Sequence, residues 1–331
     1  MTKVTVKRLI NSFLTALFLL ISCRSGEPAQ VIMDDAADFQ DEKMFVVGVS
    51  WQGLTPYCLR LGKLLLELAE EADDEIRFIY MDGQNNTEKQ ISHVENFIAH
   101  KVDLILLNPC AFHNLASAAT AANEAGIPLI TIITRIEEQE ICASYVGSNH
   151  KESALLQAEM VNRYLGMKGR IAILEGTIGI EAQLARAEGY KQILTQNPSL
   201  EVIASQPAFW EQDEAYVIVE NWLHNGMRPD VIMSQNDSMA LGALEAVTEA
   251  KLNDSIKVFG IDGDNEAVES IQEGGMEGTV FMDAFGQAKR IFECIDIIKS
   301  GNIPDKEYYV PFIVLSKDNI DDPSIRSKLR Y

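Results

Sequence analysis

The feature that most constrains the fold is an alternation, beginning at Met44, of short apolar, β-branched runs with stretches of helix length. Ten runs are typical of strands, and stretches such as 57–72, 87–100 and 113–125 between them are typical of amphipathic helices. Strands that are apolar along their whole length and separated by helices indicate parallel sheets covered on both faces. The predicted strands are residues 45–50, 76–81, 102–108, 127–133, 144–147, 170–174, 202–206, 231–235, 257–261 and 279–282.

The number of strands predicts two lobes. About 290 residues follow the first 43 of the 331-residue chain, which is too many for a single hydrophobic core. The predicted fold class is therefore α/β, with two doubly wound parallel-sheet lobes. Because an open parallel sheet binds ligands outside the carboxyl ends of its strands, the residues that follow each strand are the candidates for a binding cleft.

Aromatic and polar residues follow several of these strands. Aromatic rings pack on the C–H faces of a sugar, and charged groups make strong hydrogen bonds to its hydroxyls. This set of side chains favours a small, neutral, polyhydroxylated ligand. The residues in question are Trp51, Thr55 and Tyr57 after the first strand, Thr134 and Arg135 after the fourth, and Trp210, Asn236 and Asp262 after later ones.

Each of these residues also has a purely structural interpretation. Asp237 is expected to cap the helix that follows it, and Asn236 is an alternative cap. Asp262 precedes a glycine in a turn, where Asp is common in any case, and Arg135 alternatively forms a surface ion pair with Glu137 or Glu138. Arg186 is expected to hold its own helix against a neighbour. The two tryptophans stay open between ligand contact and ordinary packing.

The N-terminus predicts export. Two lysines and an arginine precede the largely apolar residues 9–21, a stretch too short for a transmembrane helix but suited to a signal peptide. It ends in Leu20-Ile21-Ser22-Cys23, which resembles a bacterial lipobox, whose cysteine receives a diacylglyceryl group after cleavage. We therefore expect a signal peptide over 1–22, a lipid on Cys23 and an acidic, flexible tether over 23–43; an uncleaved anchor or a buried helix is the alternative.

Charge and reactive residues exclude several function classes. The formal charge of −21 becomes −24 once the three positive charges of the signal peptide are removed, which argues against nucleic-acid binding. The cysteines lack C-x-x-C spacing and the histidines are dispersed, so we expect no metal, no cofactor and no catalytic site. Cys110 and Cys142 either form a disulfide or pack as small hydrophobes.

Several motifs support a specific family. From about residue 44 to residue 317 the chain resembles the ribose-binding branch of the type 1 periplasmic binding proteins. This resemblance implies hinge closure on a ligand, without catalysis, and three crossings between the lobes, near 147–149, 282–283 and 310–311. It assigns 44–148 plus 283–310 to the N-terminal lobe and 149–282 plus 311–331 to the C-terminal lobe. The motifs are Asp82-Gly83-Gln84-Asn85-Asn86, Asn108-Pro109, Ala125-Gly126-Ile127-Pro128, Ala204-Ser205-Gln206-Pro207-Ala208, Gln235-Asn236-Asp237 and Gly260-Ile261-Asp262-Gly263.

The ligand contacts of the family carry over only in part. Arg135, Asn236 and Asp262 match its polar contacts, and two aromatic residues stand where it has rings. Three positions depart from it, since the family has Asp, Arg and Gln where this chain has Thr134, Leu184 and Met282. A ligand other than plain ribose is therefore expected. The full candidate set is Trp51, Thr55, Tyr57, Thr134, Arg135, Leu184, Trp210, Asn236, Asp262 and Met282.

Together these features predict an exported, monomeric solute-binding protein. Cys23 would anchor it at the outer face of the cytoplasmic membrane or in the periplasm, where it delivers a sugar-like ligand to an ABC permease. The alternative is a sensory role, in which the protein presents the bound ligand to a sensor kinase or chemoreceptor. A repressor of the same fold would begin with a DNA-binding motif, whereas this chain begins with an export signal.

Overall fold

The structure of the protein is a computed structural model that describes residues 44–72 and 76–329. The expected signal peptide, the lipidated Cys23 and the tether lie outside the described residues. Within the described ranges, no helix is both long and apolar enough to cross a bilayer.

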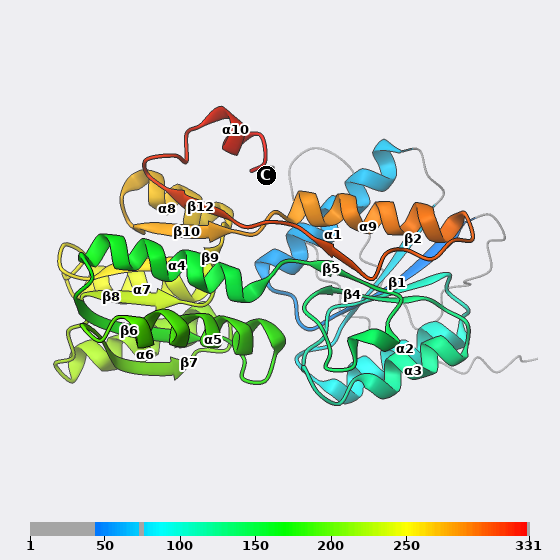
Figure 1. The fold of residues 1–331 in the computed structure, drawn as a ribbon, viewed down its shortest axis with the longest axis horizontal. Helices are drawn as coiled ribbons and strands as arrows, with labels where there is room; N and C mark the ends of the chain where they lie inside the picture. Colours follow the sequence, from blue (N-terminus) through cyan, green and yellow to red (C-terminus); the bar gives the residue numbers. More distant parts are fainter. Residues whose placement is uncertain (1–43, 73–75, 330–331) are drawn as a thin grey trace, which may run out of the picture. The chain divides into compact units, whose positions relative to one another are not determined.

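The first sheet has six strands in the order β11-β5-β4-β3-β1-β2, and all of its neighbours are parallel. Helices α1 and α9 run along one side of this sheet and α2 and α3 along the other (Figure 1). The strands are β1 (Phe45–Trp51), β2 (Ile76–Asp82), β3 (Leu104–Leu107), β4 (Leu129–Ile133), β5 (Ser144–Gly147) and β11 (Glu307–Tyr309). The helices are α1 (Pro56–Glu71), α2 (Thr87–Ala99), α3 (Ala116–Glu124), α9 (Ala284–Lys299) and the short η1 (Gln139–Ile141).

The second sheet also has six strands, in the order β12-β10-β9-β8-β6-β7. Its strands are parallel except β12, which pairs antiparallel with β10. The strands are β6 (Gly169–Glu175), β7 (Leu200–Pro207), β8 (Val231–Ser234), β9 (Lys257–Asp262), β10 (Gly278–Phe281) and β12 (Ile313–Ser316). The helices are α4 (His150–Leu165), α5 (Glu181–Gln196), α6 (Gln212–His224), α7 (Asp237–Glu249), α8 (Asn265–Glu273) and α10 (Pro323–Arg326).

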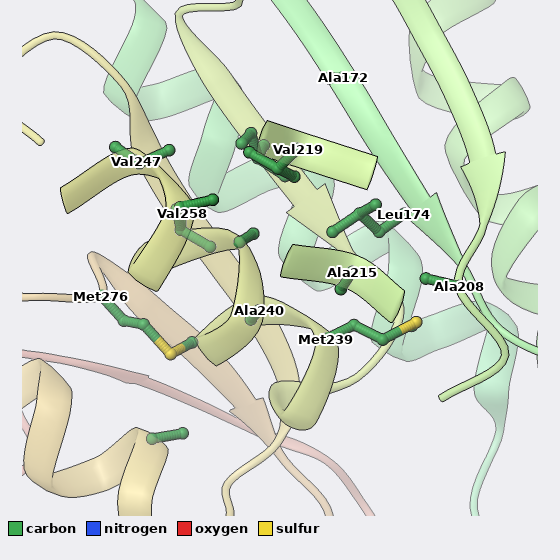
Figure 2. Packing of buried hydrophobic residues seen from close by; sticks show 14 of the residues in the cluster. Ala172, Leu174, Ala208, Ala215, Val219, Met239, Ala240, Val247, Val258 and Met276 are labelled. Atoms are coloured by element: carbon green, nitrogen blue, oxygen red, sulfur yellow. The ribbon is translucent and has the colours of Figure 1, made fainter. Parts of the chain in front are cut away.

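Apolar strands buried on both faces explain why helices pack on both sides of each sheet. Successive side chains of a strand point to opposite faces. In β6, Ala172 and Leu174 join the cluster formed with α6, α7 and α8, whereas Ile171 and Ile173 join the cluster formed with α4 and α5. Figure 2 shows the first of these clusters, in which Leu174 of β6 lies beside Ala215 of α6.

The predicted fold class is confirmed, with one correction. All ten predicted strands occur, most with ends displaced by one or two residues, and two lobes are built on the two sheets. Strands β11 and β12 were not predicted, and the antiparallel β12 makes the second sheet mixed rather than parallel. The chain passes between the sheets after β5, after β10 and after β11.

Both sheets reverse their strand order at the same place, beside their first strand. The order places β1 between β2 and β3, and β6 between β7 and β8. In an open parallel sheet, ligands bind beyond the carboxyl ends of the strands at such a reversal. This topology predicts a binding site among the residues that follow β1, β4, β6, β8 and β9.

Candidate functional site

A pocket lies where the residues that follow the strands of both sheets meet. The cavity volume that water can enter is about 50 Å³, several times the roughly 10–15 Å³ that one water needs. Its lining combines aromatic rings, charged groups and apolar side chains. The lining residues are Gln52, Thr55, Pro56, Tyr57, Cys58, Asn108, Ile133, Thr134, His150, Ile180, Ala182, Arg186, Trp210, Asn236, Asp262, Asp264 and Met282.

Seven of the ten residues predicted to bind a ligand line this pocket: Thr55, Tyr57, Thr134, Trp210, Asn236, Asp262 and Met282. The other three lie outside the lining. Trp51 is buried in the core of the first lobe, where its ring stacks on Tyr80 at 6.0 Å between centroids. Leu184 is 41% exposed on α5.

Arg135 is held by aromatic rings rather than directed into the pocket. Its guanidinium carbon lies 4.3 Å from the ring centroid of Tyr145 and 5.1 Å from that of Tyr309. It also donates a hydrogen bond to the Tyr309 hydroxyl and lies 3.7 Å from a carboxylate oxygen of Glu307. Arg135 therefore pairs with Glu307 of β11, an unpredicted strand, rather than with Glu137 or Glu138.

The wall contributed by the first lobe begins at the N-terminus of α1. The Thr55 hydroxyl caps this helix by accepting a hydrogen bond from the Cys58 amide at 3.3 Å, and Pro56 takes the first helical position. Tyr57 is thereby turned inward, and its buried hydroxyl has no partner among the protein atoms. Burial raises the pKa of Tyr57 well above its usual value, so this hydroxyl keeps its proton and stays available as a donor.

Thr134 has already used its donor within the first lobe. Its hydroxyl lies 3.3 Å from both the Asn108 side-chain oxygen and the Pro109 carbonyl oxygen. A hydroxyl has a single proton to donate. Thr134 therefore offers a ligand only an acceptor, whereas an aspartate at this position would offer a charged one.

Trp210 forms the aromatic wall of the second lobe. Its backbone has a φ of +71°, and its indole N–H is buried without a protein partner. Gly176 makes room for the indole, since a Cβ there would lie 2.0 Å from the ring. The Asn236 amide nitrogen donates to the Trp210 carbonyl at 3.3 Å, while the Asn236 oxygen caps α7 by accepting from the Met239 amide at 3.0 Å.

Arg186, His150 and Asp262 form a buried polar group at the base of the pocket. Arg186 donates to an Asp262 carboxylate oxygen and lies within 3.4 Å of the His150 Nδ1 atom. His150 Nε2 lies 2.7 Å from the carbonyl oxygen of Ile133, which can only accept. Nε2 therefore carries the proton and Nδ1 accepts from Arg186. Burial and the guanidinium of Arg186 lower the pKa of His150 to about 3, so the ring is neutral.

Three aspartates converge behind Arg186. Asp237 accepts from the Thr279 hydroxyl at 2.6 Å and from the Asp264 amide at 2.8 Å. Burial raises the pKa values of Asp237, Asp262 and Asp264, although Arg186 acts in the opposite direction on Asp262. Asp262 also has a φ of +123°, a conformation that costs about 1–3 kcal/mol in a non-glycine residue.

These contacts correct two of the structural interpretations. Asn236, not Asp237, caps α7, because Asp237 is the first residue of the helix and is directed into the buried carboxylate cluster. Arg186 lines the pocket, so its role extends beyond holding α5 in place. His150 and Arg186 belong to helices rather than to strand ends. The one sequence signal for Arg186 is its position one helical turn before Tyr190, which places both residues on the buried side of α5.

The four cysteines of the described residues, Cys58, Cys110, Cys142 and Cys294, are free and buried. The disulfide between Cys110 and Cys142 that the sequence left open is therefore not formed, and these side chains pack as small hydrophobes. Within 44–72 and 76–329, no group of three or more His, Cys, Asp or Glu side chains is arranged to hold a metal ion.

A family model described as the periplasmic binding protein domain matches residues 45–302. The chain belongs to the periplasmic binding protein family. It is 31% identical to the ribose import binding protein of Bacillus subtilis, over 92% of this chain and 98% of that protein. It is 29% identical to a xylitol-binding protein of Mycolicibacterium smegmatis, over 87% of this chain and 81% of that one.

The solved structures agree with this membership. An ABC transporter solute-binding protein from Bacillus halodurans, crystallised with myo-inositol, is 33% identical and superposes with a TM-score of 0.82, covering 87% of this chain and 99% of that chain. These relatives bind solutes and are not enzymes. The chain is accordingly a binding protein, as the sequence predicted, and the pocket is its candidate ligand site.

Proposed function

We propose that this protein captures a neutral polyhydroxylated molecule, a sugar or a polyol, between its lobes and delivers it to an ABC permease. The observation that carries the proposal is the pocket at the strand ends, where two aromatic rings face a buried carboxylate and unpaired donors. Ribose, xylitol and myo-inositol, which the similar proteins are named for or hold, share this hydroxyl-rich, uncharged chemistry.

We further propose that the ligand is a polyol or a modified sugar rather than plain ribose. Met282 adds an apolar surface to the pocket where the ribose-binding pattern has an amide, and the Thr134 donor is already used. A ligand with fewer hydrogen-bonding groups on this side fits such a lining, because an unmatched buried polar group costs about 1–3 kcal/mol.

The proposed capture works by hinge closure of a monomer. The N-terminal lobe would comprise 44–148 plus 283–310 and the C-terminal lobe 149–282 plus 311–331, with the crossings near 147–149, 282–283 and 310–311 acting as hinges. Transport is proposed rather than sensing because a similar curated protein is an import protein. Permease and ATPase genes beside this gene would support transport, whereas a histidine-kinase gene there would support the sensory alternative.

Export and anchoring complete the proposal. The signal peptide would be removed before Cys23, whose diacylglyceryl group would hold the protein at the membrane; two lipid chains anchor firmly where one does not. The test is fractionation of cells that express the full chain or its Cys23→Ser variant. We expect the variant to leave the membrane fraction and to lose incorporation of labelled palmitate. A variant that stays membrane-bound and labelled would refute the anchor.

A thermal-shift screen tests the ligand class. The chain beginning at residue 24 is heated with D-ribose, xylitol, myo-inositol, adenosine or an amino acid. A ligand at 100 times its Kd adds about 2.7 kcal/mol to the stability of the folded state, which is several degrees in Tm. We expect xylitol or myo-inositol to raise Tm more than D-ribose does.

Matched variants make the screen specific for the pocket. Asp262→Asn should lose the Tm shift, whereas Asp254→Asn, at an exposed position of the same lobe, should keep it. A shift produced only by adenosine or by the amino acid would contradict the proposed ligand class. A sugar-induced shift that Asp262→Asn retains would place the binding site elsewhere.

A further inference from the structure

Arg60 of α1 reaches across from the first lobe to the segment that ends β9 in the second. Its guanidinium donates to the carbonyl oxygens of Gly263, at 2.9 Å, and Asp262, at 3.4 Å. It also lies 3.4 Å from a carboxylate oxygen of Asp264. None of these partners belongs to the sheet on which α1 packs, so all three contacts join the two lobes.

The same side chain touches a pocket wall of its own lobe. Arg60 lies one helical turn after Tyr57, and its guanidinium carbon is 5.3 Å from the centroid of that ring. Arg60 therefore contacts the Tyr57 ring of the first lobe and, in the second lobe, the main chain at Asp262, whose carboxylate lines the pocket. Its side chain is only 16% exposed, so these contacts are partly shielded from water.

The charges around this segment favour a bridging cation. Asp237, Asp262 and Asp264 are buried together, and within the second lobe Arg186 pairs with Asp262 alone. Arg60 supplies a second positive charge only while the lobes are together. A buried carboxylate without a compensating cation is costly. Opening the lobes would take Arg60 away from the carboxylate of Asp264, and this loss favours the closed arrangement.

The backbone of Asp262 gives a second reason for the contact. Its φ of +123° is unfavourable for a side-chain-bearing residue, and the surrounding structure must hold it. Two of the Arg60 hydrogen bonds are to carbonyl oxygens within this turn. They fix the direction in which the Asp262 carboxylate enters the pocket.

From these contacts we infer that Arg60 is a positioning residue that latches the two lobes together and orients Asp262 for the ligand. The inference rests on the proposed hinge closure but not on the identity of the ligand. It predicts that Arg60 stabilises the closed arrangement far more than it stabilises either lobe by itself.

Distances between spin labels test the latch without any sugar. Labels are placed through Glu95→Cys on α2 and Glu220→Cys on α6, both exposed, in the chain beginning at residue 24, where the native cysteines are buried. Arg60→Gln should lower the ratio of short to long distances roughly ten-fold or more, because it removes hydrogen bonds from a charged donor. Tm should change little.

Two further variants separate a latch from a general structural role. Arg60→Lys keeps the charge but cannot donate to several acceptors in a fixed geometry. It should therefore restore part of the population at the short distance that Arg60→Gln loses. Arg290→Gln breaks an exposed ion pair with Glu293 inside α9 and should match the unaltered protein. Identical distance distributions for Arg60→Gln and the unaltered protein, or an unaltered protein already at the long distance, would overturn the inference.

Affinity provides an independent measurement. Titration calorimetry with D-ribose, xylitol and myo-inositol should show roughly 10- to 100-fold weaker binding by Arg60→Gln for each probe that binds the unaltered protein. Unchanged affinity would overturn the role in positioning Asp262. If none of the three probes binds, the proposed sugar function fails, while the label distances still decide whether Arg60 latches the lobes.

Discussion

His150 gives the sharpest physical prediction, a pH-dependent loss of stability. Its ring is 1% exposed, with Nε2 bound to the Ile133 carbonyl and Nδ1 facing Arg186. Burial and the neighbouring guanidinium lower its pKa from 6.5 to about 3 in the folded protein. The unfolded chain therefore binds a proton at a pH where the folded protein does not, and acidification favours unfolding.

The sign and size follow from proton linkage. Because the pKa is depressed on folding, the stabilisation is complete above about pH 6.5 and is lost as the pH falls toward 3. Between pH 7 and pH 5 the loss from this one group amounts to about 2 kcal/mol. That is a large fraction of the 5–15 kcal/mol by which folded proteins are typically stable.

Glu181 acts in the opposite direction over the same range. Burial raises its pKa from 4.5 to about 7, against the opposing effect of Arg135. Its contribution is complete below about pH 4.5 and is lost as the pH rises through 7, which adds about 2 kcal/mol of stability on going from pH 7 to pH 5. The two effects nearly cancel, and the raised pKa values of Asp237, Asp262 and Asp264 act in the same direction as Glu181. The pH profile of the unaltered protein alone therefore does not reveal the contribution of His150.

The assay therefore compares variants. Urea unfolding of the chain beginning at residue 24 is measured without ligand at pH 7 and pH 5, for the unaltered protein, His150→Gln and His224→Gln. The deficit in unfolding free energy of His150→Gln should shrink by about 2 kcal/mol at pH 5. The exposed His224 serves as the control and should give a constant difference. A deficit of His150→Gln that stays the same at both pH values would refute the reasoning.

Two further predictions concern the pocket. Asp262→Asn should weaken binding of the active probe from the screen at least roughly ten-fold, because it removes a charged acceptor; calorimetry showing unchanged affinity would exclude Asp262 from the site. Gly176→Ala should also abolish binding, since its Cβ would lie 2.0 Å from the Trp210 indole and would force the ring out of place. A tryptophan emission spectrum of the protein and an affinity that both match the unaltered protein would contradict this packing.

The fold could be predicted because its signal is repetitive and local. Strands buried on both faces are apolar throughout, as in β3, or nearly so, as in β8, which ends in Ser234, and glycine or proline marks the helix ends. Strand β11 escaped because only Tyr308 of its three residues is buried. Strand β12 was not predicted because it pairs antiparallel with β10 and so departs from the alternation of strands and helices that predicts parallel sheets.

The lining of the candidate pocket could be predicted where the strand order alone determines which residues lie together. Residues at or just beyond strand ends, such as Asp262 and Asn236, are brought together by the sheet order alone. Helical residues are different, because their direction depends on how each helix is rotated on its sheet. Arg186 and Arg60 point to the pocket region for that reason, while Leu184, two residues from Arg186, points to solvent. No strand-end rule distinguishes these positions.

Three orphaned donors in one pocket indicate what its ligand must offer. The Tyr57 hydroxyl, the Trp210 indole N–H and the Arg186 Nε atom are buried without protein partners, and each such group costs about 1–3 kcal/mol. These donors come from both lobes, so the cost arises when the lobes close. A ligand that presents several acceptors around an apolar carbon skeleton would offset it, whereas an apolar molecule would leave it unrelieved. The same donors thus act against the Arg60 latch while the pocket is empty and favour closure once a polyhydroxylated ligand fills it.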